Sequence, residues 1–208
     1  MRKLLGRTSS INVRKVLWTC MELDLPFEHD PNWGLGFRSA KSPEFLALNP
    51  NAQIPVLVEG DFVLWESNSI IRYLANSQGA SRLYPQPAEA RARVDQWLDW
   101  QAAELNPSWS YVFHSLVRKN PDFQNPDLLR QGQARWAAAM AILDGQLGHT
   151  GAFVCGADFT LADIAIGLSV NRWFQTPFDR PGFPAVEAYR RRLAERDGYA
   201  RYCGEGQP

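Results

Sequence analysis

The spacing of apolar residues changes once along this chain, near residue 80, and this change limits the folds open to it. Before it, short apolar runs typical of strands alternate with stretches whose apolar residues recur at the period of an amphipathic helix. From about residue 90 onward we find the helical period alone. The sequence therefore predicts an α/β domain over residues 1–78, a proline-containing linker over 79–88 and an all-helical domain over 89–208.

The elements predicted in the first domain form a small mixed sheet flanked by helices. A strand, a helix ending near Leu23 and a second strand make a right-handed crossover unit, in which the two strands are parallel. Two valine-rich runs separated by Gly60 and Asp61 make a hairpin, which adds antiparallel strands. Along the chain we expect strands at 3–7 and 25–29, a short helix at 43–49, strands at 54–60 and 61–66, and a helix from Ser67.

Composition and charge exclude several classes of function. The 208 residues include 22 basic and 22 acidic side chains, so we expect no concentrated basic face for nucleic acid. No apolar run has the length of a membrane span, and Arg7 interrupts the first apolar stretch, unlike a secretory signal. The three cysteines, Cys20, Cys155 and Cys203, lack CxxC or zinc-ligand spacing, which indicates no metal site, no disulfide framework and a reducing cytoplasm.

The stretch NPNAQIPVLV, residues 49–58, places Pro55 at the start of a strand. A proline there donates no hydrogen bond to the sheet, and X-Pro bonds adopt the cis form at little cost. A cis Ile54–Pro55 bond would turn the N–H and C=O of Ile54 outward, where an extended peptide can pair with them. A trans proline on an edge strand is the alternative, and it is the more frequent form.

The stretch WESNSIIRYLA, residues 65–75, places Glu66 and Ser67 where the hairpin ends and a helix begins. Ser67 suits the N-cap position, and a helix N-terminus also binds anions through its free N–H groups and its dipole. Glu66 would suit a cationic amine, so the pair fits the carboxylate and ammonium groups of an α-amino acid. A simple cap beside a solvated glutamate is the alternative.

The stretch GRTSSINVRKVLW, residues 6–18, places Ser9, Ser10 and Asn12 before a half-buried helix. These side chains either cap the helix or hold a reactive group against its positive end. Further on, Thr160 and Asp163 form a capping-box pattern with a structural role. The apolar stripe of the first helix consists of Val13, Val16, Leu17, Cys20 and Met21.

Taken together, these stretches resemble the cytosolic glutathione transferases, in particular bacterial, serine-type, theta- or nu-like members. SSINVRKV, NPNAQIPVL, ESNSIIRYL and FTLADIAI occur in the family's order and at its spacing over nearly the whole chain. The resemblance implies a thioredoxin-like N-terminal domain followed by an all-helical C-terminal domain. It also implies a homodimer, with glutathione as a co-substrate and no prosthetic group.

The resemblance also assigns the residues of a glutathione site. Ser10 and Asn12 would be catalytic, because hydrogen-bond donors at the positive end of a helix favour the glutathione sulfur as a thiolate. Ser9 is the alternative to Ser10, since a register error of one residue exchanges them. The backbone of Ile54 before Pro55 would pair with the cysteinyl part of glutathione. The remaining contacts would come from Glu66 and Ser67 at the γ-glutamyl end and from Gln53 and Lys41 at the glycine carboxylate.

A second, hydrophobic substrate is expected between the domains. Aromatic side chains are more often core than pocket, so only part of the candidate wall is expected to face a substrate. Asp99 would approach the γ-glutamyl amine bound to the partner subunit. The candidate wall residues, from the first loop and the first long helix, are Trp33, Leu35, Phe37, Trp109, Val112, Phe113 and His114.

The predicted activity is the addition of glutathione thiolate to a small hydrophobic electrophile, as in detoxification. Two alternatives stay open on the same fold: glutathione-dependent reduction of a disulfide or peroxide, and non-catalytic binding. The first loop contains no cysteine, so the protein cannot form a mixed disulfide there. Glutathione would then supply every sulfur.

Overall fold

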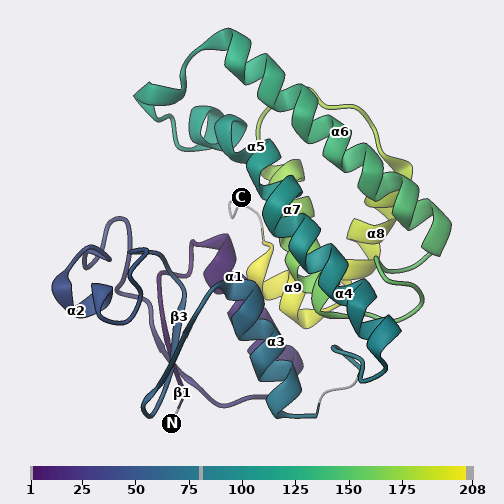
Figure 1. Ribbon diagram of the computed structural model, residues 1–208. Helices are drawn as coiled ribbons and strands as arrows, with labels where there is room; N and C mark the ends of the chain where they lie inside the picture. The colour runs from purple at the N-terminus through teal and green to yellow at the C-terminus, as the bar shows by residue number, and fades with distance from the viewer. Residues whose placement is uncertain (1, 80–81, 205–208) are drawn as a thin grey trace. The chain divides into compact units, whose positions relative to one another are not determined.

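The computed structural model describes residues 2–79 and 82–204 (Figure 1). The chain divides into two compact units, residues 1–84 and 85–208. The division follows Tyr84, inside the stretch that the sequence predicts as a linker. Residues 80 and 81 of that linker, residue 1, and residues 205–208 of the predicted helical domain lie outside the described residues.

The first unit is built on a four-stranded mixed sheet, with the strands in the order β2-β1-β3-β4 among the described residues. β1 runs parallel to β2 and antiparallel to β3, and β3 and β4 form an antiparallel hairpin. This is the predicted arrangement. The elements are β1 (Arg2–Leu5), α1 (Ile11–Glu22), β2 (Glu28–Asp30), α2 (Pro43–Leu46), β3 (Val56–Glu59), β4 (Phe62–Trp65) and α3 (Ser67–Ser77).

Alternation along β1 and β3 divides their side chains between the two faces of the sheet. Leu5 pairs with Val56, and both join a buried cluster that includes Trp33 and a side chain of α2. The next pair in the register, Leu4 and Leu57, is equally buried and belongs to the opposite face. On that side α1 and α3 lie next to each other (Figure 1).

α1 buries the apolar stripe that its sequence predicts. Val13, Val16, Leu17 and Cys20 are at most 3% exposed, whereas Met21, near the end of the helix, is 39% exposed. Because α1 and α3 pack against each other, the N-terminal residues of both helices are held on the same scaffold.

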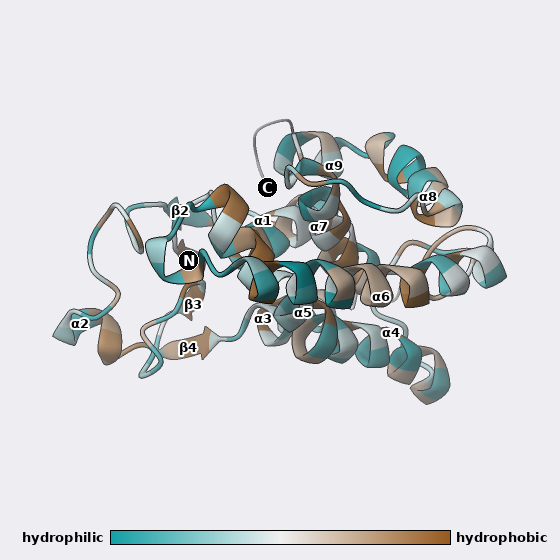
Figure 2. Ribbon diagram, turned by 90° about the horizontal axis from the view of Figure 1, so that it is seen from above, coloured by the Kyte–Doolittle hydropathy of each residue, from teal (hydrophilic) through white to brown (hydrophobic). Residues whose placement is uncertain are grey.

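The second unit contains helices and, within its described residues, no strand apart from an isolated bridge between Phe153 and Gly156. Polar and apolar residues are interspersed along α4, α5 and α6, as expected of amphipathic helices that bury one side (Figure 2). All residues from Leu161 to Trp173 of α7 are buried, so α7 carries much of the core. The helices are α4 (Ala88–Trp100), α5 (Asn106–Val112), α6 (Pro126–Thr150), α7 (Leu161–Gln175), α8 (Pro184–Ala194) and α9 (Asp197–Tyr202).

Three short helical segments complete the second unit. Two π-helical segments, Gln101–Leu105 and Phe113–Val117, flank α5, and a 3-10 segment spans Pro121–Phe123. Across the described helices of both units, none is long and apolar enough to span a membrane.

The start of α7 is fixed by the predicted capping box. The Asp163 carboxylate is fully buried and accepts hydrogen bonds from the backbone N–H of Thr160 at 2.8 Å and from its hydroxyl at 3.1 Å. It also accepts from the N–H of Val154 at 2.9 Å and from the hydroxyl of Tyr189, in α8, at 3.0 Å. The predicted structural role is confirmed, and the same carboxylate ties α8 to the start of α7.

Candidate active site

Ser10 is the N-cap residue of α1, yet its hydroxyl does not cap the helix. Its backbone is extended (φ −82°, ψ 125°) and its C=O accepts the N–H of Arg14 at 3.0 Å, while no side-chain capping bond forms. The neighbouring Ser9 is exposed, and its hydroxyl accepts a hydrogen bond from the Arg7 guanidinium at 3.1 Å. Of the two serines, Ser10 is therefore the one placed at the positive end of α1 without a capping role.

Asn12 lies in the first turn of α1 and is half-buried. Its side-chain oxygen is buried and has no hydrogen-bond partner among the described residues. The first turn of α1 contains no acidic residue, so its own side chains do not offset the positive helix end. The start of α1 thus offers a hydroxyl and a helix dipole to an anion, to which Asn12 could add only the NH2 group of its amide, because the unpartnered oxygen accepts hydrogen bonds.

Ile54 and Pro55 directly precede β3, and the peptide bond between them is cis. This is the form that the family resemblance implies. Ile54 lies outside the strands, and none of the backbone hydrogen bonds formed outside the described helices and strands involves it. The backbone of Ile54 is therefore a candidate for pairing with an extended peptide.

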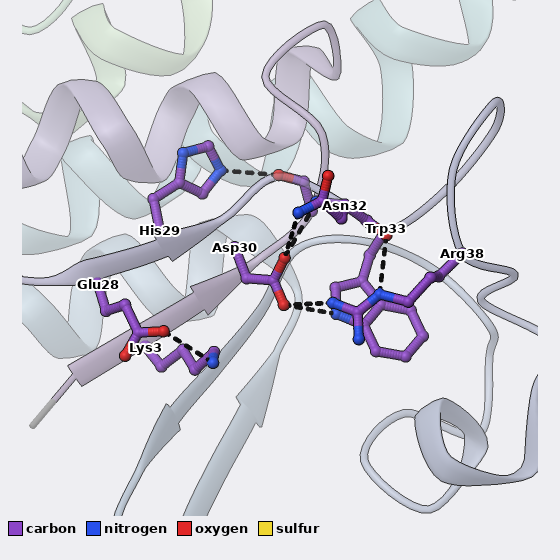
Figure 3. Close-up of polar contacts among 8 residues, drawn as sticks. Lys3, Glu28, His29, Asp30, Asn32, Trp33 and Arg38 are labelled. Atoms are coloured by element: carbon purple, nitrogen blue, oxygen red, sulfur yellow. Dashed lines mark hydrogen bonds and ion pairs between the residues drawn. The ribbon is translucent and has the colours of Figure 1, made fainter.

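Gly6 allows the start of α1 and the Ile54 segment to approach the same backbone. Its φ of +140° favours glycine, and a Cβ there would lie 2.7 Å from Cγ2 of Val13 and 2.9 Å from Cβ of Ile54. The imidazole of His29, in β2, donates to the Gly6 carbonyl at 2.8 Å (Figure 3). A side chain at residue 6 would push the two parts of the candidate site apart.

Asn49 holds the loop before Ile54, a role that the sequence does not reveal. It is 2% exposed; its Nδ2 donates to the carbonyl of Gln53 at 2.8 Å, and its Oδ1 accepts the N–H of Asn51 at 3.0 Å. The side chains of Gln53 and Lys41 are both exposed. The Asn-Pro-Asn tripeptide is the one signal in the sequence, and it indicates a turn without indicating burial.

The junction between β4 and α3 differs from the prediction in its cap. The N-cap residue is Glu66, and Ser67 is the first residue of the helix, so the prediction that Ser67 is the N-cap is wrong. Glu66 has a φ of 70°, in the left-handed region, and such strained residues cluster at functional sites. The Glu66 side chain is exposed, whereas Ser67 is 6% exposed.

Lys15 links α1 to the start of α3 and was not identified from the sequence. Its side chain is 1% exposed, and its Nζ donates to Oγ of Ser67 at 3.3 Å and to Oδ1 of Asn68 at 3.0 Å. Lysine is among the residues least often buried, so no local pattern points to this contact.

The loop after β2 carries three predicted wall residues in two different environments, and Figure 3 shows one of them, Trp33, with its neighbours Asp30 and Arg38. Trp33 lies in the core, donates to the Asp30 carboxylate at 3.2 Å and stacks 3.9 Å from the Arg38 guanidinium. Arg38 and Asp30 also form an ion pair. Leu35 and Phe37, between these anchoring residues, are 71% and 54% exposed. Trp33 thus supports the loop, while Leu35 and Phe37 are open to a ligand.

Comparison with known proteins places the chain in a family. Models of the glutathione S-transferase N-terminal and C-terminal domains match residues 9–77 and 126–192. The glutathione S-transferase GstB of Escherichia coli K12 is 34% identical over 195 residues, which cover 93% of each chain. The chain belongs to the glutathione S-transferase family. Its residues 9–77 include the serines before α1, the Ile54–Pro55 bond and the Glu66–Ser67 junction.

A further relative and a solved structure support the same family for this glutathione transferase. Glutathione S-transferase 3 of Zea mays is 33% identical, covering 96% of this chain and 91% of its own. The theta class enzyme of the citrus canker pathogen Xanthomonas axonopodis pv. citri, solved with glutathione bound, has a TM-score of 0.90 and 32% identity, covering 100% of this chain and 99% of its own. The predicted thioredoxin-like fold, helical second domain and transferase class are confirmed.

The transferase has no described cysteine suited to act as a nucleophile near its first strand. Cys20 is 2% exposed, and burial raises the pKa of its thiol to about 12. Burial likewise raises the pKa of Cys155 to about 12. Since a thiol reacts as its thiolate, neither residue competes with an external thiol at neutral pH.

In the second unit of the transferase, the predicted wall residues Trp109, Val112 and Phe113 are all buried. The rings of Trp109 and Phe113 meet edge to face at 5.7 Å, and the Arg172 guanidinium lies 4.3 Å and 4.0 Å from their centres. These aromatic residues therefore form part of the unit's core, as most aromatic side chains do.

His114 is half-buried and stacks on Phe123, with 4.6 Å between the ring centres. Burial, together with the charges of Arg118 and Arg172, lowers the pKa of His114. Asp99, on α4, is exposed.

Proposed function

We propose that this transferase binds glutathione on its first unit and holds the sulfur as a thiolate beside Ser10 and Asn12. The N-cap hydroxyl of Ser10, which stands at the positive end of α1 without capping it, carries the proposal. Lowering a thiol pKa of ~8.5 by two units needs roughly 2.7 kcal/mol of preference for the charged sulfur. A hydrogen bond to a charged group contributes about 1.5–3 kcal/mol and a helix dipole about 0.3–1 kcal/mol. Ser10 therefore suffices as a hydrogen-bond donor.

The rest of the tripeptide is assigned to the neighbouring segments. The backbone of Ile54, next to the cis bond, pairs with the cysteinyl part. Glu66 and Ser67 hold the γ-glutamyl end, where the exposed Glu66 carboxylate suits the amine and the start of α3 suits the carboxylate. The exposed side chains of Gln53 and Lys41 are the candidates for the glycine carboxylate.

The second substrate in this proposal is a small hydrophobic electrophile. Leu35 and Phe37 are the first-unit side chains assigned to it, because they are apolar and exposed. The family resemblance supports a homodimer in which Asp99 approaches the partner's site. Cys20, Cys155 and Cys203 form no disulfide among the described residues, which supports a cytoplasmic location.

Calorimetric titration of glutathione into wild type, Ser10→Ala and Ser9→Ala tests the proposal, followed by assays of aryl-halide conjugation and of disulfide reduction. We expect Ser10→Ala to lose about 10–100-fold in conjugation, the value of one hydrogen bond to a charged sulfur. Ser9→Ala is the matched control and should retain activity, because the Ser9 hydroxyl contacts Arg7 in the wild type.

Each alternative has its own outcome. Lost turnover in Ser9→Ala alone would move the sulfur contact to Ser9. Turnover of disulfides but not of aryl halides would indicate the reductase, and binding without any turnover would indicate a non-catalytic protein. No heat with the wild type would contradict the glutathione site.

A further inference from the structure

Lys15 places a buried positive charge directly behind the start of α3. The side chain is 1% exposed, and two of its hydrogen bonds, at 3.3 Å and 3.0 Å, reach the first two residues of that helix, Ser67 and Asn68. Both are themselves buried, at 6% and 9% exposed. The ammonium therefore acts on a fixed pair of polar groups, in surroundings where electrostatic interactions are stronger than in water.

The direction of these hydrogen bonds determines what Ser67 offers a ligand. An ammonium has three donors and no acceptor, so the Ser67 oxygen must accept from Lys15. A hydroxyl whose oxygen accepts one bond has its own proton available to donate elsewhere. Lys15 thus presets Ser67 as a donor, which suits a carboxylate and disfavours an ammonium. Asn68 is oriented in the same way, since its Oδ1 is the atom that faces Lys15.

We propose that Lys15 is a positioning residue that makes the start of α3 selective for the α-carboxylate of the γ-glutamyl group. It acts through Ser67 and by adding its charge to the positive end of the helix. This inference rests on the proposed glutathione function. It assigns the selectivity for a carboxylate to a residue that lies on α1.

The test compares two tripeptides: glutathione, and 4-aminobutyryl-cysteinyl-glycine, which differs only in lacking the α-carboxylate. Their dissociation constants are measured calorimetrically with wild type and Lys15→Met, which has a similar length and no charge. We expect Lys15→Met to weaken glutathione binding at least about tenfold and to change binding of the analogue less than about threefold. Lys3→Met, which removes a partly exposed lysine paired with Glu28 at 2.8 Å, is the charge-matched control and should change neither constant.

An equal loss for both tripeptides leaves the ratio of the two dissociation constants unchanged. That result would show that Lys15 has only a structural role and would overturn the proposal. If the wild type bound neither tripeptide, the proposed function would fail instead. Should Lys15→Met not fold, which circular dichroism would show, Lys15→Gln replaces it in the same comparison. Ser67→Ala should reproduce the loss of discrimination, because it removes the group that Lys15 orients.

Discussion

At the scale of single residues, the candidate site depends on the absence of a Cβ at Gly6. Gly6 directly follows β1, and the absence of a Cβ there lets Val13 of α1 and Ile54 approach the same backbone. The left-handed φ adds a second reason for glycine. Any other residue at position 6 would strain the backbone next to the place where the sulfur of glutathione is proposed to bind.

We expect Gly6→Ala to lower the free energy of unfolding by roughly 2–6 kcal/mol, the sum of backbone strain and overpacking. Urea denaturation measures it. Gly60→Ala is the control, because Gly60 also has a positive φ, of +62°, but a Cβ there meets nothing within 4 Å. A loss in Gly6→Ala no larger than in Gly60→Ala would contradict the steric argument.

The residues that the sequence did not reveal share a physical reason. Lys15 and Asn49 act because they are buried, and burial of a polar side chain is decided by distant parts of the chain. Ser10 and Glu66 were accessible to sequence reasoning because they stand at helix starts, where the local pattern already indicates a role. The left-handed backbone of Glu66, however, has no local signal, so the sequence predicts the cap at Ser67, one residue too late.

At the scale of elements, the start of α7 depends on a single carboxylate. The Asp163 carboxylate accepts hydrogen bonds from two backbone N–H groups and two hydroxyls. The donors are Val154, Thr160 and Tyr189, which lie in three different segments. An unsatisfied buried donor costs about 1–3 kcal/mol, and α7 carries much of the core of its unit. The cap therefore matters to the whole second unit.

We expect Asp163→Ala to destabilise the protein by roughly 3–5 kcal/mol, measured by chemical denaturation. Asp127→Ala is the control, since Asp127 also lies in the first turn of a helix but is exposed and pairs with an exposed Arg130. That control should cost at most about 1 kcal/mol. Equal losses of stability in the two variants would show that the burial of Asp163 does not increase its contribution to the free energy of unfolding.

Most elements could be predicted, because the period of the apolar residues is a local property. The strands and helices of the first unit start or end within three residues of their predicted limits. The wall residues were less accessible. A sequence cannot distinguish the buried Trp33 from the exposed Leu35 and Phe37 of the same loop, since all three are large and apolar.

At the scale of the whole molecule, the change of apolar period near residue 80 corresponds to the division of the chain into two units after Tyr84. Each unit has its own buried core, built on a sheet in one and on α7 in the other. The chemistry proposed for the sulfur and the γ-glutamyl group lies within the first unit.

We expect the protein to be a homodimer in solution. Light scattering coupled to size exclusion should give a mass of about 47 kDa, twice the 23.5 kDa of one chain. Asp99→Ala, an exposed residue of α4, should leave the mass unchanged and weaken glutathione binding if it acts on the partner's site. A mass near that of a single chain at all concentrations would contradict the dimer.

The loop after β2 has a consequence for how such an enzyme can evolve. Trp33 and Arg38 form a bridge at its base, and the N–H of Phe37 donates to the carbonyl of Gly34 at 2.9 Å, so backbone and ion-pair contacts define its shape. Leu35 and Phe37 contribute little to that shape, because their side chains are mostly exposed. Substitutions at such positions usually change stability by less than about 0.5 kcal/mol. Leu35 and Phe37 are the residues that we propose for the electrophile site, so mutations there can change the electrophile preference while the fold and the proposed glutathione site stay unchanged.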